Sequence, residues 1–198
     1  MKRMRRIVFA TNNANKIREV QALLGKQYQF LSLAEIGCEE EIPETTGTIP
    51  GNALQKASHV NTHYGEDCFS EDTGLEIDAL GGAPGVDTAY YAGPQRSATA
   101  NMAKVLSELA EQTNRGAQFR TVIALILDGK EHLFEGIVRG KIALAPKGEG
   151  GFGYDPIFIP DGYDTSFAEM SPRDKNAISH RGRAVAKLQA FLQQLADA

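Results

Sequence analysis

The sequence predicts an α/β protein in which helices flank a mixed β-sheet. Short apolar runs alternate along the chain with segments whose apolar residues recur at helical spacing. The turn signal Asp128-Gly129 lies between two apolar runs in mid-chain, so the sheet needs an antiparallel pair among its strands. A length of 198 residues and a hydrophobic content of 42% suit one globular domain over residues 1–198.

The first part of the chain is expected to form two strand and helix pairs. Residues 7–10 are a short apolar strand, and the amphipathic helix that follows ends before Gly25. A second strand is expected over residues 28–33, and an acidic loop over 39–44 comes next. A second helix over about 52–64 then places alanine, leucine and valine on one face.

The middle of the chain combines turns with one more helix. Two short strand pieces, residues 68–70 and 75–78, are expected to flank a polar turn at 71–74. A third amphipathic helix is expected over 97–111.

The last part begins with a hairpin and ends in a helix. Residues 119–127 and 133–142 are expected to pair as its two strands. Ser171 and Ser179 stand where helix N-caps are expected, and the last helix runs over about 179–195.

Charge and cysteine usage exclude several classes of function. A net charge of -4 provides no basic field for nucleic acid or an anionic membrane surface, so a polyanion must meet a local site. No apolar run approaches the roughly 18 residues of a membrane span. Cys38 and Cys68 lack the spacing of a zinc motif, which favours a reducing compartment, and we expect a cytoplasmic protein.

The turn between the first strand and the first helix is a candidate phosphate site. Its hydroxyl, amides and free N–H groups could surround an anion, and its lysine adds a positive charge. Thr and Asn are also the preferred helix caps, so a well-capped helix start is the alternative. The residues of this candidate site are Thr11, Asn12, Asn13, Ala14, Asn15 and Lys16.

Adjacent carboxylates at Glu71 and Asp72, with Glu44 from the acidic loop, are a candidate magnesium site. Mg²⁺ takes oxygen ligands and shares substrate phosphates, and a carboxylate beside it can accept a proton from an attacking water. A solvated turn is the competing interpretation, because Asp-Thr-Gly is ordinary turn composition.

The glycine-rich segment 148–156 is a candidate base site. Its glycines match a dinucleotide-binding pattern, but the apolar run after it excludes the helix that such a site requires. Phe152 could instead stack on a base while Asp155 accepts hydrogen bonds from it. Alternatively, Phe152 fills the core.

Lys175, His180 and Arg181 gather basic groups near the start of the last helix, where positive charge opposes the helix dipole. Such donors could bind phosphate or the O6 of a purine, although they could equally be exposed basic side chains. His59 and His63 have i, i+4 spacing, but without an acidic or cysteine partner they are more typical of a solvated helix face than of a metal site.

Taken together, these segments resemble the inosine triphosphate pyrophosphatase family, whose members hydrolyse non-canonical purine nucleoside triphosphates. The resemblance covers nearly the whole chain. The segments that carry it are Thr-Asn-Asn-Ala-Asn-Lys at 11–16, Asn-Ala-Leu-Gln-Lys-Ala at 52–57, Glu-Asp-Thr-Gly-Leu at 71–75, Leu-Gly-Gly-Ala-Pro-Gly-Val at 80–86, Gly-Gly-Phe-Gly-Tyr-Asp-Pro-Ile-Phe at 150–158 and Lys-Asn-Ala-Ile-Ser-His-Arg-Gly at 175–182. Each is weak alone, but their shared order is specific.

The resemblance implies an elongated mixed sheet, two lobes around a nucleotide-binding cleft, and a homodimer. It also implies Mg²⁺-dependent hydrolysis of ITP, dITP and XTP to the monophosphate and pyrophosphate, with no nucleic acid or membrane partner. The implied roles are triphosphate binding by Thr11, Asn13, Lys16 and Lys56; metal binding by Glu44, Asp72 and the nearby Glu71; general base catalysis by Asp72; stacking by Phe152; contacts to base and sugar from Asp155 and Lys175; and reading of the six-keto edge by His180 and Arg181. Further substrate contacts are expected from Thr73, Gly153 and Tyr154.

Two other functions stay open on the sequence. The first is a pyrophosphatase for other modified or pyrimidine nucleotides, and the second is a nucleotide-binding module without turnover. One departure from the family pattern is Gly51, where a Glu often precedes the Asn-Ala pair; we expect it to affect the start of the second helix rather than the chemistry.

Overall fold

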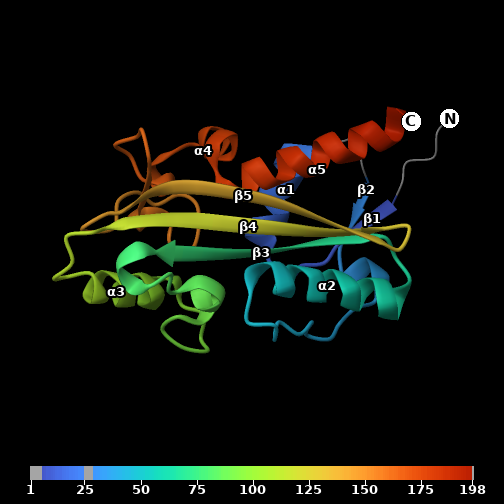
Figure 1. Ribbon diagram of the computed structural model, residues 1–198, viewed down its shortest axis with the longest axis horizontal. Coiled ribbons are helices and arrows are strands. Elements are labelled where there is room, and N and C mark those ends of the chain that lie inside the picture. Colours follow the sequence, from blue (N-terminus) through green and yellow to red (C-terminus); the bar gives the residue numbers. More distant parts are fainter. Residues whose placement is uncertain (1–5, 25–28, 198) are drawn as a thin grey trace. The chain divides into compact units, whose positions relative to one another are not determined.

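The computed structural model of the chain describes residues 6–24 and 29–197 (Figure 1). Over these residues the strands form one sheet in the order β2-β1-β3-β4-β5-β6. β1 is parallel to β2 and β3, whereas β5 and β6 are antiparallel. The strands are β1 (Arg6–Phe9), β2 (Gln29–Leu31), β3 (Cys68–Ile77), β4 (Gly116–Leu127), β5 (Lys130–Ile142) and β6 (Phe158–Pro160). The predicted mixed sheet is confirmed.

Helices occupy the predicted parts of the chain. They are α1 (Ala14–Leu24), α2 (Ile49–Tyr64), α3 (Ala98–Glu108), α4 (Pro172–Ile178) and α5 (His180–Asp197). Ser171 is confirmed as the N-cap of α4, because its side chain accepts a hydrogen bond from the backbone N–H of Asp174. The expected helix stop at Gly25 and the strand start at Tyr28 lie outside the described residues.

The chain divides into two compact units, each assembled from separate stretches of sequence. Unit 1 comprises Met1–Asp72, Thr121–Gly136 and Arg181–Ala198, and unit 2 comprises Thr73–Arg120 and Ile137–His180. The expected single domain and the expected cleft between two lobes stay predictions.

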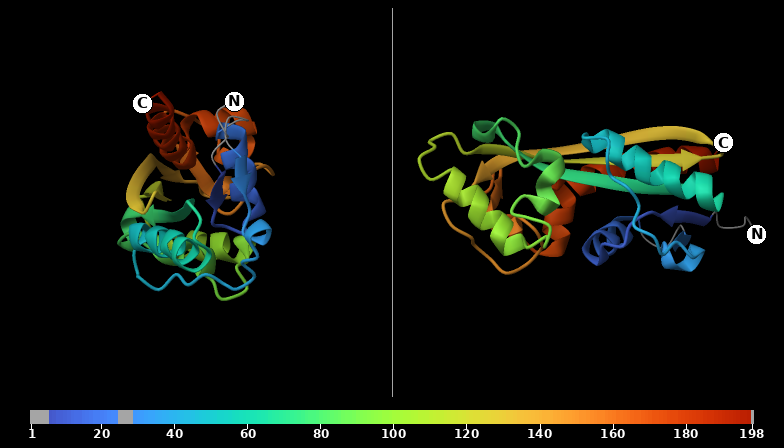
Figure 2. Two further views of the ribbon diagram at one scale, coloured as in Figure 1. Left: turned by 90° about the vertical axis from the view of Figure 1, so that its right-hand side faces the viewer. Right: turned by 90° about the horizontal axis from the view of Figure 1, so that it is seen from below.

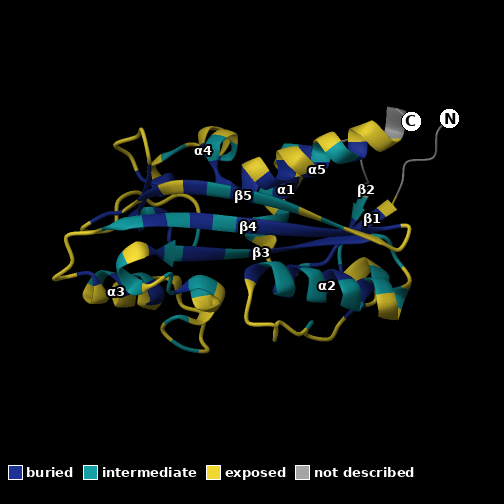
Figure 3. Ribbon diagram, in the orientation of Figure 1, coloured by how far each residue is buried: buried dark blue, intermediate teal, exposed yellow. Residues whose placement is uncertain are grey.

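Unit 1 has apolar packing on both faces of its strands. On one face α2 contributes Ala53, Ala57 and Val60, which pack against strand residues such as Val8 and Val122. On the other face α1 and α5 pack through residues such as Val20 and Leu188 against the opposite side chains of the same strands. The views in Figures 1 and 2 show α2 and α5 on opposite sides of the sheet. Figure 3 shows exposed residues along the solvent-facing side of α5, whereas α2 is mostly of intermediate burial on its outer side.

Unit 2 has an aromatic core. Phe119 of β4 lies with ring centroids 4.7 Å from Phe158 of β6 and 6.2 Å from Phe167. α3 closes this core with Val105, which is fully buried. Aromatic pairs in this distance range contribute packing energy beyond the area they bury.

The largest error in the prediction concerns residues 71–74. They are not a turn at a strand end but lie inside β3, which runs unbroken from Cys68 to Ile77 and is buried along most of its length. Asp-Thr-Gly is typical of turns, but neighbouring strands on both sides and helices on the faces override that local preference.

Helix ends differ by a few residues from the prediction. α2 begins at Ile49, with the Thr48 side chain accepting a hydrogen bond from the N–H of Gly51. A Cβ at Gly51 would collide with the hydroxyls of Thr46 and Thr48. The glycine that replaces the usual Glu of the family therefore leaves room for the N-cap at Thr48. α3 ends at Glu108 instead of 111.

The hairpin is confirmed at its predicted position. Asp128 and Gly129 both have positive φ angles, 50° and 72°, as a tight two-residue hairpin turn requires. Over the described residues, no helix combines the length and the apolar character that crossing a membrane needs.

Candidate active site

β3 carries the two adjacent carboxylates of unit 1 on opposite faces of the sheet. Consecutive side chains of a strand alternate between faces. Phe69 and Glu71 accordingly lie on the α1 and α5 side, where Glu71 meets Lys16. Cys68 and Asp72 lie on the α2 side, where Asp72 meets Lys56. The two neighbouring acids therefore have different partners and different chemical environments.

Glu71 is a buried carboxylate held by two cations. Its Oε1 lies 2.9 Å from Lys16 Nζ, and the Arg181 guanidinium donates to its two oxygens at 2.7 and 3.0 Å. Burial opposes ionisation of Glu71, but the charges of Arg181 and Lys16 outweigh it and hold the pKa of Glu71 well below its ordinary value. Glu71 is thus a permanent anion that fixes two positively charged side chains.

Arg181 is the largest fully buried side chain among the described residues. Its NH1 donates to Glu19 Oε2 at 2.5 Å, while its other nitrogens hold Glu71. The surrounding carboxylates raise the pKa of Arg181 above its ordinary value, although burial acts in the opposite direction. Its predicted contact with the six-keto edge of a purine stays a prediction.

Asp72 lies in a different arrangement with Lys56 and Glu44. Lys56 Nζ is 2.5 Å from Glu44 Oε1 and 3.7 Å from Asp72 Oδ1, so one ammonium group serves both carboxylates. Burial raises the pKa of Asp72, helped by Glu44 and Glu71 and opposed by Lys56 and Lys16. A carboxylate whose pKa is raised is better suited to accept and release a proton.

Asp72 Oδ2 is the unsatisfied atom of this group. It is buried and has no hydrogen-bond partner among the described residues. On this face of the sheet two carboxylates, Glu44 and Asp72, lie against the ammonium group of Lys56. Buried polar atoms are normally paired, and an oxygen-only donor pair is the kind that Mg²⁺ takes. Glu44 and Asp72 therefore fit a divalent cation; a contact from Glu71 stays a prediction.

The turn before α1 is ordered by its own side chains. Asn13 Oδ1 accepts hydrogen bonds from the N–H groups of Asn15 and Lys16 at 3.0 and 3.2 Å, and Thr11 Oγ1 accepts one from Asn13 N–H at 3.1 Å. Asn12 and Ala14 are exposed beside them. The helix cap and the candidate phosphate site thus use the same residues. A bound phosphate would compete for the N–H groups that now donate to the Thr11 and Asn13 side chains.

In unit 2 the predicted base-binding residues form one compact cluster. Lys175 Nζ lies 2.6 Å from Asp155 Oδ2 and 4.8 Å from the centre of the Phe152 ring. Asp155 Oδ2 also accepts the Phe152 N–H at 2.9 Å. Gly151 has a φ of +67°, and a Cβ there would collide with the Asp155 carboxylate. The loop, its aromatic ring and the ion pair therefore depend on each other.

The other predicted residues of unit 2 have identifiable surroundings. His180 is 3% exposed, and its ring stacks on Phe119 with centroids 4.5 Å apart. The Tyr154 hydroxyl donates to Thr88 O at 2.7 Å, which places Tyr154 in the core. Gly153 and Thr73 are half-buried. Of the two aromatic residues in this loop, Phe152 is half-buried and Tyr154 is buried.

Sequence reasoning missed two groups of residues. Glu19, the second partner of Arg181, lies three positions after Lys16 and so on the same face of α1, a signal that the sequence offers. The aromatic support of His180 and Lys175 by Phe119 and Phe167 joins distant strands and loops, and no local pattern indicates it.

The chain is similar to known proteins over nearly its whole length. The Ham1 family model matches residues 7–191. The chain is 53% identical over 187 residues to the dITP/XTP pyrophosphatase of Flavobacterium psychrophilum, covering 94% of this chain and 98% of that one. It is 45% identical over 194 residues to the enzyme of the same name from Bacillus subtilis, covering 96% and 98%.

A solved structure supports the same assignment. The Ham1 protein of Staphylococcus aureus superimposes with a TM-score of 0.89 at 38% identity, covering 96% of this chain and 99% of that one. The resemblance predicted from the ordered sequence motifs is confirmed, and the chain belongs to the Ham1 family.

Proposed function

We propose that this protein hydrolyses the non-canonical purine nucleoside triphosphates dITP, XTP and ITP to the monophosphate and pyrophosphate, with Mg²⁺ as cofactor. The names of its relatives support the substrate class. The observation that carries the proposal is the buried Asp72 Oδ2, which has no hydrogen-bond partner among the described residues and belongs to a carboxylate of raised pKa beside two lysines.

The residues of unit 1 serve the triphosphate. Lys16 and Lys56 supply positive charge for the phosphates, and the turn that begins at Thr11 and Asn13 offers N–H groups at the start of a helix. Glu44 and Asp72 would hold Mg²⁺. When bound, the metal would neutralise charge that builds up on the departing pyrophosphate.

Asp72 acts as the general base in this proposal. It accepts a proton from the attacking water, whose oxygen forms a bond to the α-phosphorus. The bond from that phosphorus to the bridging oxygen breaks, and pyrophosphate leaves with both bonding electrons. The proton on Asp72 then passes to solvent. Lys16 and Lys56 stabilise the negative charge of the leaving group by electrostatic attraction.

The residues of unit 2 serve the base and sugar. The Lys175 ammonium covers one face of the Phe152 ring, so a purine would stack on the other face. Asp155 and Lys175 contact the base and sugar, assisted by the backbone at Gly153. His180, together with its sequence neighbour Arg181 of unit 1, would favour the six-keto group, because the amine of adenine at that position cannot accept their hydrogen bonds.

Pyrophosphate release tests the proposal directly. The purified protein is assayed with dITP, XTP, ITP, GTP, ATP and dTTP, each with Mg²⁺ and with a chelator. We expect turnover of the first three to exceed that of ATP and dTTP, and the chelator to abolish it. A preference for dTTP would support the alternative of a pyrimidine or modified-nucleotide pyrophosphatase. Tight ITP binding without pyrophosphate release would support the binding module.

A cytoplasmic homodimer is also part of the proposal, because the nucleotide pool is the expected site of action and the family resemblance implies a dimer. Light scattering during size-exclusion chromatography measures the mass in solution, and cell fractionation locates the protein. A monomer at working concentration, or recovery with the membrane fraction, would contradict these two points separately.

A further inference from the structure

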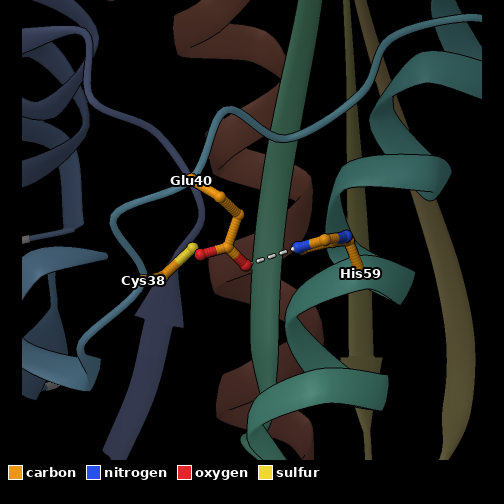
Figure 4. Close-up of side chains that lie close together, drawn as sticks. All are labelled: Cys38, Glu40 and His59. Atoms are coloured by element: carbon orange, nitrogen blue, oxygen red, sulfur yellow. Dashed lines mark hydrogen bonds and ion pairs between the residues drawn. The ribbon is translucent and has the colours of Figure 1, made fainter.

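Cys38, Glu40 and His59 bring three different metal-ligating groups together in unit 1 (Figure 4). The Cys38 Sγ, a Glu40 carboxylate oxygen and a ring nitrogen of His59 lie within 4.8 Å of one another. It is the one such group in the part of the chain that the structure describes. In Figure 4 the thiol and the carboxylate come from the loop before α2, and the imidazole reaches toward them from the helix.

The donors are held in place before any ion binds. Glu40 Oε1 is 2.9 Å from His59 Nε2, and the Tyr64 hydroxyl donates to the Glu40 oxygens at 2.9 and 2.7 Å. The hydrogen bonds of His59 and Tyr64 lower the pKa of Glu40 to about 2, so this carboxylate is ionised at neutral pH. His63 stacks on His59 with centroids 4.3 Å apart, which steadies the imidazole from the side.

The donor types decide which ion fits. A thiolate, an imidazole and a carboxylate are together the ligands of Zn²⁺, whereas Mg²⁺ prefers oxygen alone. Tetrahedral coordination would place the three donor atoms roughly 3.5 Å apart, so small side-chain movements suffice from the spacing seen here. For the ion to bind, the Cys38 thiol must give up its proton to solvent, whereas the His59 imidazole binds in its neutral form, with the proton on the ring nitrogen that does not ligate the metal.

We propose that Cys38, Glu40 and His59 form a Zn²⁺ site that joins the loop before α2 to that helix. Cys38 is buried, while the Glu40 side chain is 45% exposed, so solvent can reach the site and supply a fourth ligand. None of its three donors belongs to the residues proposed for nucleotide hydrolysis. The same loop and helix nevertheless carry two of those residues, because the loop continues to Glu44 and α2 carries Lys56.

Titration with Co²⁺ as a probe tests the site in the full-length, reduced protein. Excess Mg²⁺ is present throughout, so that oxygen-only sites are occupied. We expect one equivalent of Co²⁺ to produce thiolate-to-metal absorption that Zn²⁺ then abolishes by displacement. Cys38→Ser and His59→Gln should lose this absorption. Cys68→Ser and His132→Gln are the matched controls and should keep it, because the Cys68 thiol donates a hydrogen bond to Ala57 O and the His132 ring packs against Phe191.

Affinity measurements grade the individual contributions. Tyr64→Phe removes a hydroxyl that contacts Glu40 and Cys38 but is not itself one of the three donors, and it should weaken Zn²⁺ binding about 10- to 100-fold, whereas loss of a donor itself should weaken it more. Absence of thiolate absorption in the wild type, or absorption that survives Cys38→Ser, would overturn the proposal.

A second readout does not depend on Cys38, whose replacement in the core could disturb folding. Zn²⁺ should raise the thermal unfolding midpoint of the wild type but not that of His59→Gln, in which a half-buried surface residue is changed. An equal rise in both proteins would contradict the site. Because neither readout measures nucleotide hydrolysis, failure of this proposal and failure of the proposed function can be told apart.

Discussion

The two units hold their candidate functional residues by different means. In unit 1, Lys16, Glu71 and Arg181 form a continuous series of ion pairs whose members are largely removed from solvent. In unit 2, the buried ion pair of Lys175 with Asp155 lies against aromatic rings. The first arrangement depends on several ion pairs, whereas the second combines one ion pair with contacts between a cation and aromatic rings.

This difference separates two kinds of loss. Removing one partner from a buried charge network leaves the other charge without compensation, which costs stability or chemistry heavily. Removing an aromatic surface costs mainly contact area and stacking energy. Variants of unit 1 should therefore affect turnover and folding, and variants of unit 2 should affect substrate affinity.

The largest expected effect is on turnover. Asp72→Asn keeps the shape of the side chain but removes the proton acceptor, so kcat for dITP should fall by about 10²- to 10⁴-fold. Folding should be retained, as circular dichroism can verify. Asp78→Asn, in an exposed pair with Arg139, is the matched control and should keep near-normal turnover. Near-normal turnover of Asp72→Asn would place the base elsewhere.

The next largest effect is on stability. Arg181→Met leaves Glu71 and Glu19 facing each other without their shared cation, and the free energy of unfolding should fall by about 3–5 kcal/mol. Urea unfolding measures the loss. Arg139→Met breaks only the exposed pair with Asp78 and should cost less than about 1 kcal/mol. Equal losses would mean that burial of the network is irrelevant to its strength.

A smaller effect is expected from the aromatic surface of unit 2. Phe152→Ala should raise KM for ITP by about 5- to 150-fold, the equivalent of the roughly 1–3 kcal/mol that base stacking contributes. Its kcat should change much less. Tyr163→Ala, which removes an exposed aromatic ring, is the control. An unchanged KM in Phe152→Ala would remove the stacking role.

The smallest expected effect concerns stability in acid, and it tests whether the ionised Glu71 carboxylate stabilises unit 1. The pKa of Glu71 is held below its ordinary value of 4.5, so its ionised form stabilises the fold above that pH. This stabilisation is lost as the pH falls from there toward the lowered pKa. The stability difference between the wild type and Glu71→Gln should consequently be widest near neutral pH and narrow below about pH 4.5. Urea midpoints from pH 7 to pH 3 measure it, and a constant difference would contradict the assignment.

Local patterns predicted most of the fold. The apolar spacing of α1, α2 and α5 and the hairpin signal at Asp128-Gly129 correspond to elements of the structure. The failure at residues 71–74 has a physical cause, since a polar, glycine-containing segment becomes a strand only when neighbouring strands supply its hydrogen bonds. That information lies in distant parts of the chain.

Which residues belong to the candidate site stays a prediction, but the pairing of their side chains can be compared with the structure. Family motifs indicated Lys16, Lys56 and Lys175, and each proves to have a carboxylate partner. The i, i+4 spacing of His59 and His63, without an acidic or cysteine partner, favours a solvated helix face over a metal site. Folding brings Cys38 and Glu40 to His59 across about 20 residues, which spacing within one helix cannot reveal.

Each unit is assembled from separate stretches of sequence, and this restricts which parts of the chain could be deleted or fused to another protein. β3 passes from unit 1 to unit 2 between Asp72 and Thr73, β4 returns between Arg120 and Thr121, and β5 leaves again between Gly136 and Ile137. No uninterrupted stretch of the gene encodes either unit. A fusion or deletion that kept one unit and removed the other would cut β3, β4 and β5 within their lengths. We therefore expect the two sets of functional residues to be inherited together.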